Sequence, residues 1–352
     1  MNFTYDALPN RVIFGIGKIN QVKDEAIHLG AKRALILATP RQTELAQRVA
    51  DLLGDLFVGL NTKAVQHVPQ EIIAESMVDV QNFDADLLIP LGGGSTIGLA
   101  KGIALENGLP ILAIPTTYAG SEMTPIWGIS KGGRKTTGRN PSVKPKTVIY
   151  DPELLVSLPP ALSITSGINA MAHSVEALYA KDANPITSMM AEEGVRGLAQ
   201  GLPLVAQDPA NLDARSSTLY GAWLSATVLG QVGMALHHKL CHTLGGSFGM
   251  PHAETHTVIL PYATDFNSTS APEAIAAMAR ALGCNESDVA GAIQDIARHN
   301  GGPVSLRELG FEEGDLDQAT EIAMQSQYSN PRPFTQDDIR QLLGQAFEGA
   351  RP

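Results

Sequence analysis

Three histidines occupy six consecutive positions at the start of the segment HHKLCHTLGG (237–246), a concentration of imidazoles that points to chemistry. His238 and His242 are four residues apart in a stretch of helical character, so both should project from one face of a helix. His237 projects elsewhere, and we interpret it as a packing or rim residue. Imidazoles at this spacing can bind a metal, exchange protons or simply pack.

A second pair with the same spacing lies in GINAMAHSVE (167–176), where Asn169 and His173 are four residues apart. A further histidine, His252, follows a proline in the segment MPHAETH. Two such pairs and a Pro-His sequence favour a functional site, because buried imidazoles without partners are costly. The candidate site therefore consists of Asn169, His173, His238 and His252, with His242 one helical turn beyond.

A glycine-rich junction in the N-terminal half is a candidate phosphate site. The segment LLIPLGGGSTIGLAK (87–101) predicts a buried strand, a triple glycine and a helix that opens at Ser95 or Thr96. Backbone N–H groups and the helix dipole at such a junction bind negative charge. The alternative is a tight connection without a ligand. The candidate cofactor-binding residues are Gly92, Gly93, Gly94, Ser95 and Thr96.

The next predicted strand ends in a second polar loop, IPTTYAGSEMTP (114–125). Ligands of open α/β sheets bind at the carboxyl ends of the strands, so two polar loops there favour a dinucleotide site. The hydroxyl-bearing candidates in this loop are Thr116, Thr117, Tyr118 and Ser121.

The first of these predicted strands ends at Thr39 in LILATPRQ (35–42), with Arg41 close by. Many nucleotide folds place a carboxylate at this strand end, where it binds the adenosine ribose and repels a 2′-phosphate. Because Thr39 carries no charge, we expect weak discrimination between NADH and NADPH.

The elements that must position these residues differ between the two halves of the chain. Residues 1–155 alternate helical stretches with short apolar runs, which predicts an α/β domain with a parallel, Rossmann-like sheet. The prolines of 152–160 mark a boundary, and residues 156–352 predict an all-helical domain that carries the histidines. The apolar runs are RALILAT (33–39), DLLIPLGGG (86–94), PILAIPTT (110–117) and TVIYDP (147–152).

Composition excludes several classes of function. The net charge of −11, from 25 basic and 36 acidic residues, argues against nucleic acid or an anionic membrane as partner. No apolar stretch approaches the roughly 20 residues of a membrane span, and the N-terminus lacks the pattern of a signal peptide. Two cysteines, Cys241 and Cys284, fit a cytoplasmic protein better than a disulfide scaffold.

The sequence resembles the iron-containing, or group III, alcohol dehydrogenases over nearly its whole length. The resemblance implies a nucleotide-binding α/β half and a helical half that holds a divalent metal, the architecture shared with dehydroquinate synthase. The matching motifs are GGGS (92–95), IPTT…GSE (114–122), DPEL (151–154), HKLCHTLGG (238–246), PH (251–252) and NPRP (330–333).

One position departs from the family pattern in a way that bears on the metal. The family ligands are an aspartate, a histidine four residues later and two further histidines, which match Asn169, His173, His238 and His252. His242 matches a histidine near the nicotinamide. An amide at 169 cannot supply the negative charge that a divalent metal favours, although three imidazoles can still bind zinc. We therefore expect a vestigial site without metal.

Within the family, the resemblance is closest to the branch that reduces maleylacetate to 3-oxoadipate with NADH or NADPH in the bacterial breakdown of aromatic compounds. It rests on TTYAGSEMTPIWGIS (116–130) and GRKTTGRNPSVKPKTVIYDPELLVSLP (133–159), and it includes GINAMAHSVEALYA (167–180). Hydride addition to this enone forms an enolate, which a protonated histidine can stabilise. We assign the main acid role to His242, and His238, His173 and His252 would shape a cationic pocket.

Other assignments are less specific. Arg332, Tyr328 and Lys239 are candidates for binding the substrate carboxylates, with solvated surface charge as the alternative. Lys135 matches a family position near the nucleotide. The competing functions are a metal-dependent alcohol or hydroxyacid dehydrogenase of the same architecture and a lyase that resembles dehydroquinate synthase. A non-catalytic nucleotide-binding protein is a third. The apolar first strand RVIFGIG (11–17) could pair across a two-fold axis, and the resemblance implies a homodimer.

Overall fold

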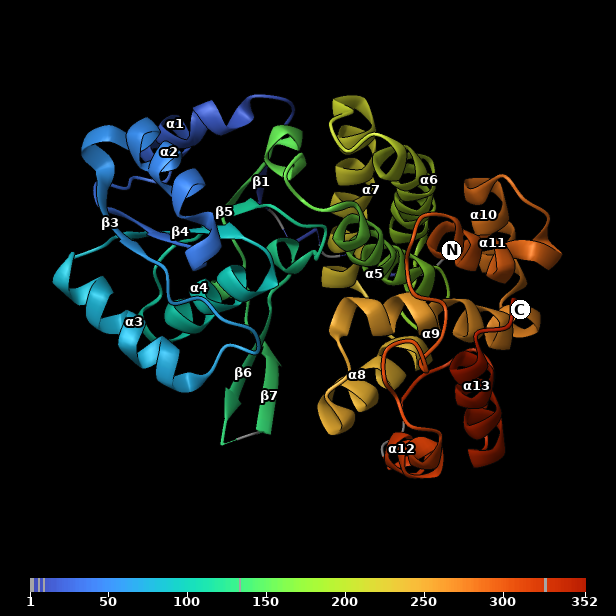
Figure 1. Cartoon of the computed structure of the whole chain (residues 1–352). Coiled ribbons are helices and arrows are strands. Elements are labelled where there is room, and N and C mark those ends of the chain that lie inside the picture. The colour runs from blue at the N-terminus through green and yellow to red at the C-terminus, as the bar shows by residue number, and fades with distance from the viewer. Residues whose placement is uncertain (1–2, 6, 9, 133, 326–327) are drawn as a thin grey trace. The chain divides into compact units, whose positions relative to one another are not determined.

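The computed structural model describes residues 3–5, 7–8, 10–132, 134–325 and 328–352, and it divides into two compact units. The α/β unit comprises residues 7–157, and the helical unit comprises residues 158–352 together with the described residues 3–5. The division at 157/158 falls two residues beyond the predicted boundary. Figure 1 shows strands only in the blue-to-green part of the chain and helices throughout the rest.

The α/β unit is built on a six-stranded sheet with the order β1-β8-β5-β4-β2-β3, in which every pair of neighbouring strands is parallel. Its strands are β1 (Arg11–Phe14), β2 (Ala34–Leu37), β3 (Phe57–Asn61), β4 (Leu87–Gly92), β5 (Leu112–Pro115) and β8 (Thr147–Tyr150). Strands β2, β4, β5 and β8 are buried along their whole length, as expected for a parallel sheet covered on both faces. The predicted α/β class is confirmed.

Helices connect these strands, as parallel pairing requires. They are α1 (Val22–His28), α2 (Thr43–Leu53), α3 (Gln70–Asn82) and α4 (Gly94–Asn107). An antiparallel hairpin of β6 (Ile126–Lys131) and β7 (Arg134–Arg139) follows β5. The chain runs from β2 to β3 at one edge and then returns to the other side of β2 to form β4. The carboxyl ends of β2 and β4 therefore form a topological switch point, where such sheets bind ligands.

The helical unit consists of nine α-helices in the described residues, which confirms the prediction for this half. They are α5 (Pro160–Leu178), α6 (Pro185–Gln207), α7 (Leu212–Gln231), α8 (Leu236–Phe248), α9 (His252–Asn267), α10 (Pro272–Leu282), α11 (Val289–His299), α12 (Leu316–Met324) and α13 (Gln336–Glu348). Helix α5 packs against α6, α7 and α9 and is buried over most of its length. It is thus a rigid support for the side chains it carries.

Close packing of α6 against α7 depends on small residues. A Cβ atom at Gly197 would lie 3.1 Å from the backbone Cα of Gly221, too close for the helices to keep their spacing. Across the same layer, the hydroxyls of Ser174 on α5 and Ser225 on α7 hydrogen-bond at 2.8 Å. These contacts fix α5 against its neighbours.

Helices α7 and α8 are separated by a break at residues 232–235, where they meet at 93°. Carboxylates take the backbone amides here: Asp182 accepts from Gly233 N at 2.9 Å, and Glu176 accepts from Ala235 N at 2.7 Å. Side-chain acceptors thus replace the helical carbonyls. Among the described residues no single helix is long and apolar enough to span a membrane, and only this bent pair meets that test jointly.

Candidate active site

Helices α5 and α8 carry the two predicted pairs of the helical unit. Asn169 and His173 lie on α5 with exposed fractions of 3% and 4%, and His238 on α8 is 6% exposed. His242 lies one turn after His238 and is exposed, as is His252 in the first turn of α9. The predicted helical spacing of both pairs is confirmed.

The structure brings these histidines together with two others into one imidazole cluster, which comprises His173, His237, His238, His242, His252 and His256. The ring of His238 lies 5.2 Å from that of His173, 4.9 Å from that of His256 and 6.2 Å from that of His242, measured between centroids. His252 joins through its ring contact with His256 at 4.5 Å. His238 is therefore the central member of the cluster.

A buried carboxylate lies against this central histidine. Glu176 on α5 is completely shielded from solvent, and its Oε2 atom lies 2.7 Å from His238 Nδ1. The same carboxylate accepts hydrogen bonds from the amides of Ala235 and His237 at the start of α8, each at 2.7 Å. It thus caps α8 at the end where the helix dipole favours negative charge.

Burial sets the charge of much of the cluster. It lowers the pKa of His173, His237 and His256 well below the usual value, and the neighbouring imidazoles lower it further. These rings are therefore neutral at pH 7. The predicted cationic pocket is wrong for His173, because the sequence does not show how completely this side chain loses its contact with water.

His237 is an interior residue of the helical unit, so the packing interpretation holds and the rim interpretation is wrong. It is 0% exposed, and its Nε2 atom hydrogen-bonds His256 Nδ1 at 2.9 Å, with Cys241 Sγ at 3.7 Å. These three residues form the only group of three histidine, cysteine or acidic ligand atoms within 4.8 Å of one another in the described part of the chain. One nitrogen of each ring is satisfied by this contact, whereas His237 Nδ1 and His256 Nε2 are buried and have no hydrogen-bond partner among the described residues.

Three buried polar atoms at the predicted site have no hydrogen-bond partner among the described residues: Asn169 Oδ1, His173 Nδ1 and His238 Nε2. Buried polar atoms are normally paired, and exceptions call for an explanation such as a ligand or ordered water. These atoms come from α5 and α8, and the two histidines among their residues are in ring contact, with centroids 5.2 Å apart. They mark the place in the helical unit where a bound group would find partners.

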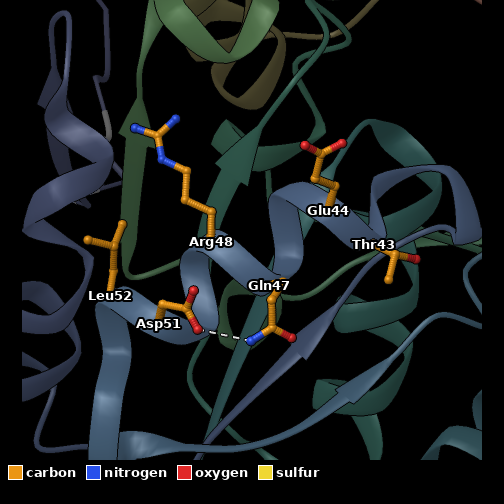
Figure 2. Close-up of a pocket in the computed structure, with 6 residues that line it drawn as sticks. All are labelled: Thr43, Glu44, Gln47, Arg48, Asp51 and Leu52. Carbon is orange, nitrogen blue, oxygen red and sulfur yellow. Dashed lines mark hydrogen bonds between the residues drawn. The ribbon is translucent and has the colours of Figure 1, made fainter.

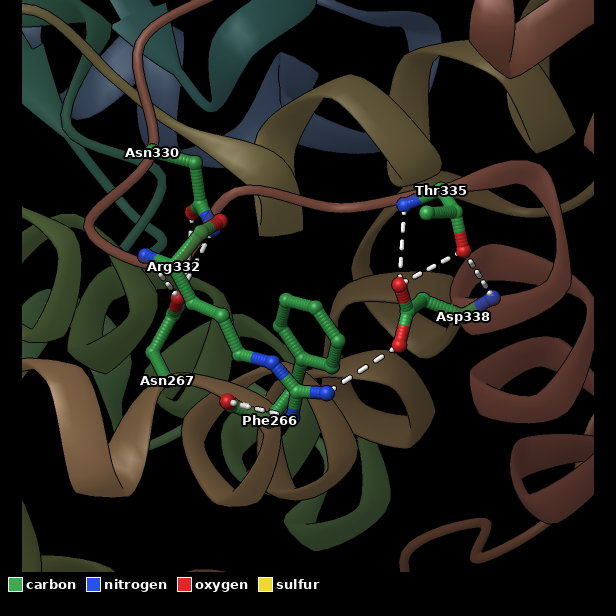
Figure 3. A network of polar contacts seen from close by, with 6 residues as sticks. All are labelled: Phe266, Asn267, Asn330, Arg332, Thr335 and Asp338. Carbon is green, nitrogen blue, oxygen red and sulfur yellow. Dashed lines mark hydrogen bonds and ion pairs between the residues drawn. The ribbon is translucent and has the colours of Figure 1, made fainter.

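Arg332 does not join the imidazole cluster. Figure 3 shows its guanidinium lying over the ring of Phe266, 4.0 Å from the centroid, with one nitrogen 3.0 Å from Asp338. Phe266 lies near the C-terminal end of α9, and His252 lies at its N-terminal end. At 1.5 Å per residue the two are about 20 Å apart along the helix. The loop is held there by Asn330, which exchanges hydrogen bonds with Asn267.

The two other predicted carboxylate-binding residues contact each other. The Nζ atom of Lys239 lies 5.9 Å from the ring centroid of Tyr328, and that ring stacks on Phe334 at 5.1 Å. Burial raises the pKa of Tyr328, with a further contribution from the charge of Glu176. Lys239 and Tyr328 thus lie on the side of α8 that faces the C-terminal loop.

In the α/β unit, the three predicted coenzyme segments meet at the switch point. Gln42 links two of them: its Nε2 atom donates to Thr116 Oγ1 at 2.8 Å, and its Oε1 atom accepts from Thr39 Oγ1 at 3.1 Å. Helix α4 begins at Gly94, with Gly93 as N-cap, one residue before the predicted start. The first amides of α4, at Gly94, Ser95 and Thr96, have no helical acceptor and can bind a phosphate.

Two of the glycines are required by crowding. Gly92 has φ +145°, and a Cβ atom there would lie 2.6 Å from Gln42 Oε1 and 2.7 Å from Thr96 Oγ1. A Cβ atom at Gly93 would lie 3.0 Å from Thr117. By contrast, a Cβ atom at Gly94 would meet open space, which is where a ligand can approach the backbone.

A buried lysine that the sequence analysis did not consider connects two of these segments. Lys101 on α4 is 0% exposed, and its Nζ atom donates to the carbonyls of Ser121, Thr124 and Ile126 at 2.6 to 2.9 Å. It therefore fixes the loop after β5 against the helix that follows the glycine loop. Burial lowers its pKa to about 7, while Glu122 opposes the shift.

The remaining predicted coenzyme residues are placed differently. The side chain of Tyr118 is 0% exposed, and its role in coenzyme binding stays a prediction. The hydroxyl of Ser121 accepts a hydrogen bond from Lys101 at 3.1 Å. Lys135 lies in β7, and its side chain lies outside the described part of the chain.

A shallow hollow of about 800 Å³ lies on one face of α2. Figure 2 shows its lining side chains, among which Gln47 donates to Asp51 at 2.9 Å. None of the predicted site residues lines it, and all the lining residues come from α2. It follows that the candidate coenzyme site is the loop cluster at the switch point and not this surface.

Two family models match the chain over most of its length. The model described as "Iron-containing alcohol dehydrogenase" matches residues 9–152, and the model described as "Fe-containing alcohol dehydrogenase family, C-terminal" matches residues 163–347. Together they cover both units.

Individual relatives match from end to end. A maleylacetate reductase of Sphingobium indicum is 51% identical over 352 residues, covering 100% of this chain and 99% of the relative. Among solved structures, the maleylacetate reductase of Agrobacterium tumefaciens is 48% identical with a TM-score of 0.97, covering 100% of both chains. The maleylacetate reductase of Rhizobium sp. strain MTP-10005 is 48% identical with a TM-score of 0.96 and the same coverage.

Proposed function

Since this chain belongs to the iron-containing alcohol dehydrogenase family, we propose that it reduces the carbon–carbon double bond of maleylacetate to give 3-oxoadipate, with NADH or NADPH as hydride donor. The observation that carries this proposal is the 51% identity over full length with a maleylacetate reductase. The match covers 100% of this chain and therefore includes both units.

The α/β unit supports the coenzyme part of the proposal. The free amides at the start of α4 suit a pyrophosphate, and the backbone at Gly94 is open to it. At the end of β2, Thr39 is a neutral hydroxyl held by Gln42, so no carboxylate there repels a 2′-phosphate. Both NADH and NADPH should therefore be accepted.

The reaction begins with hydride transfer from the reduced nicotinamide to the alkene carbon β to the ketone. The electron pair of the double bond then forms an enolate, and the nicotinamide is oxidised. Protonation of the α-carbon completes the reduction. We assign the proton donor to His242, because it is exposed to water and lies one turn from His238 on the same helix.

We propose that this reaction needs no metal, although the family name implies iron. The residues at the family's ligand positions are Asn169, His173, His238 and His252, a set without a carboxylate. Metal-bound imidazoles lie about 2.0 to 2.1 Å from the ion, which brings their nitrogens within about 4 Å. Among the described residues, the ligand nitrogens of the three histidines do not lie within 4.8 Å of one another. This donor set therefore does not fit a preformed metal site.

NADH oxidation with maleylacetate, monitored by absorbance, tests the proposed function. A simple ketone of similar length serves as the control substrate. The proposal expects turnover with maleylacetate and very little with the ketone. Comparable rates with both would favour an alcohol or hydroxyacid dehydrogenase, and net conversion without NADH consumption would favour a lyase.

We also propose a homodimer and a cytoplasmic location. Strand β1 lies at the edge of the sheet, and the backbone groups of an edge strand can pair with a second copy. Both cysteines are free, which suits a reducing compartment. Light scattering during gel filtration tests the dimer. The amides of Arg11 and Gly15 donate to carbonyls on the β8 side, so the amide of Val12 faces the open edge, and a Val12→Pro substitution should convert the dimer to monomer.

A further inference from the structure

The sequence analysis assigned no role to Glu176, yet it is the most completely buried acidic side chain against the imidazole cluster. We propose that Glu176 is a positioning residue: it fixes the tautomer and ring orientation of His238 so that the unprotonated Nε2 of this histidine accepts a hydrogen bond from an ordered water at the site. The expected effect on kcat rests on the proposed function. The expected tautomer of His238 does not, because it can be observed without substrate.

The hydrogen-bond partners of Glu176 determine the tautomer. Its oxygens accept from two backbone amides, which can only donate, and Oε2 lies 2.7 Å from His238 Nδ1. A carboxylate oxygen in this arrangement requires a proton on Nδ1. The neutral ring then has an unprotonated Nε2, because imidazole carries one N–H.

The other ring nitrogen of His238, Nε2, is left as a hydrogen-bond acceptor. His238 Nε2 is buried and has no partner among the described residues, and the same holds for Asn169 Oδ1. Since Nδ1 is held by Glu176, the ring cannot turn to exchange the two nitrogens without breaking a short hydrogen bond. Glu176 thus keeps an acceptor directed away from itself, next to the ring of His173.

Two of the three hydrogen bonds of Glu176 cap helix α8, so a purely structural role must be separated from positioning. The chain offers a matched control in Asp182. Its carboxylate accepts from Gly233 N in the same break between α7 and α8, and the contacts seen for it involve no histidine. An Asp182→Asn variant therefore perturbs the break without the His238 contact.

The kinetic test is a double-mutant cycle with Glu176→Gln and His238→Ala. If Glu176 acts through His238, Glu176→Gln should lower kcat by about 10- to 100-fold in the wild-type background and have little effect in His238→Ala. KM for NADH should stay unchanged, and Asp182→Asn should keep kcat. An equal loss of kcat from Glu176→Gln in both backgrounds would overturn the proposal and leave Glu176 as a helix cap.

The spectroscopic test needs no substrate. In protein with ¹⁵N-labelled histidine, the His238 signals, assigned by their loss in His238→Ala, should show a protonated Nδ1 and an unprotonated Nε2. Glu176→Gln should shift this population toward Nε2–H. A wild-type His238 protonated on Nε2 would overturn the proposal even if maleylacetate is reduced. The expected tautomer without maleylacetate turnover would overturn only the proposed function.

Discussion

His237 Nε2 lies 2.9 Å from His256 Nδ1 inside the helical unit, and both side chains are completely shielded from solvent. One neutral imidazole therefore donates to the other, and protonation of either ring would place a charge where no water can reach it. This pair links α8 to α9 directly behind the predicted site residues His238 and His252.

Protein stability should fall steeply below pH 6.5. Burial lowers the folded-state pKa of His173, His237 and His256, so the unfolded chain binds more protons as the pH falls. Each such histidine costs about 1.4 kcal/mol of unfolding free energy per pH unit below 6.5. Urea unfolding between pH 7.5 and 5.5 measures this slope. In His256→Gln, the slope of the unfolding free energy against pH should decrease by the amount that corresponds to about one bound proton. An unchanged slope would show that His256 does not take up a proton on unfolding.

Lys101→Met should weaken both folding and coenzyme binding. The substitution leaves the carbonyls of Ser121, Thr124 and Ile126 buried without their shared donor, at a cost of about 3 kcal/mol or more. The loop after β5 then loses its fixed position, so Kd for NADH should rise. Urea unfolding and fluorescence titration measure the two effects. Lys146→Met, at an exposed lysine, is the control and should change neither.

Substitutions at Gly92 and Gly94 should have different effects, on stability at the first position and on NADH binding at the second. Gly92→Ala forces a methyl group against Gln42 and Thr96 at a backbone angle that alanine avoids, which should cost about 1–3 kcal/mol of stability. Gly94→Ala should keep its stability but bind NADH less tightly, because the methyl group occupies the approach to the amides of α4. Equal NADH affinity in Gly94→Ala and the wild type would place the pyrophosphate elsewhere.

His242→Ala should lower kcat for maleylacetate by about 10²- to 10⁴-fold, the usual contribution of a general acid. KM for NADH should change less than kcat, because the amides that would bind the pyrophosphate lie at the start of α4 in the α/β unit. His299→Ala, at an exposed histidine of α11, controls for the general loss of an imidazole. Near-normal turnover of His242→Ala would assign the proton donor to another group.

The elements that the sequence predicted are those with a strong local pattern. The apolar runs became β2, β4, β5 and β8, and the four-residue spacing of Asn169 and His173 became one face of α5. By contrast, β3 and the hairpin β6–β7 were missed. Their sequences, FVGLN and IWGISK with RKTTGR, contain glycine or many polar residues and show no clear period.

The missed functional residues share a different cause. Glu176 and Lys101 are charged residues within helices, a pattern typical of solvated surface, and only tertiary packing buries them. Glu176 meets His238 across 62 positions of sequence, so no local spacing could reveal the contact. The contact of Gln42 with Thr116 likewise arises only in the folded chain. His256 is different, because its four-residue spacing from His252 was visible in the sequence.

The most direct test of the whole account is the position of deuterium in the product. The enzyme is first stripped by chelation and shown by elemental analysis to be free of metal, and maleylacetate is then reduced with NADH deuterated at the transferable position. The account predicts full activity and 3-oxoadipate with one deuterium on the carbon β to its ketone. Deuterium on the former carbonyl carbon, or loss of transfer on stripping, would contradict it.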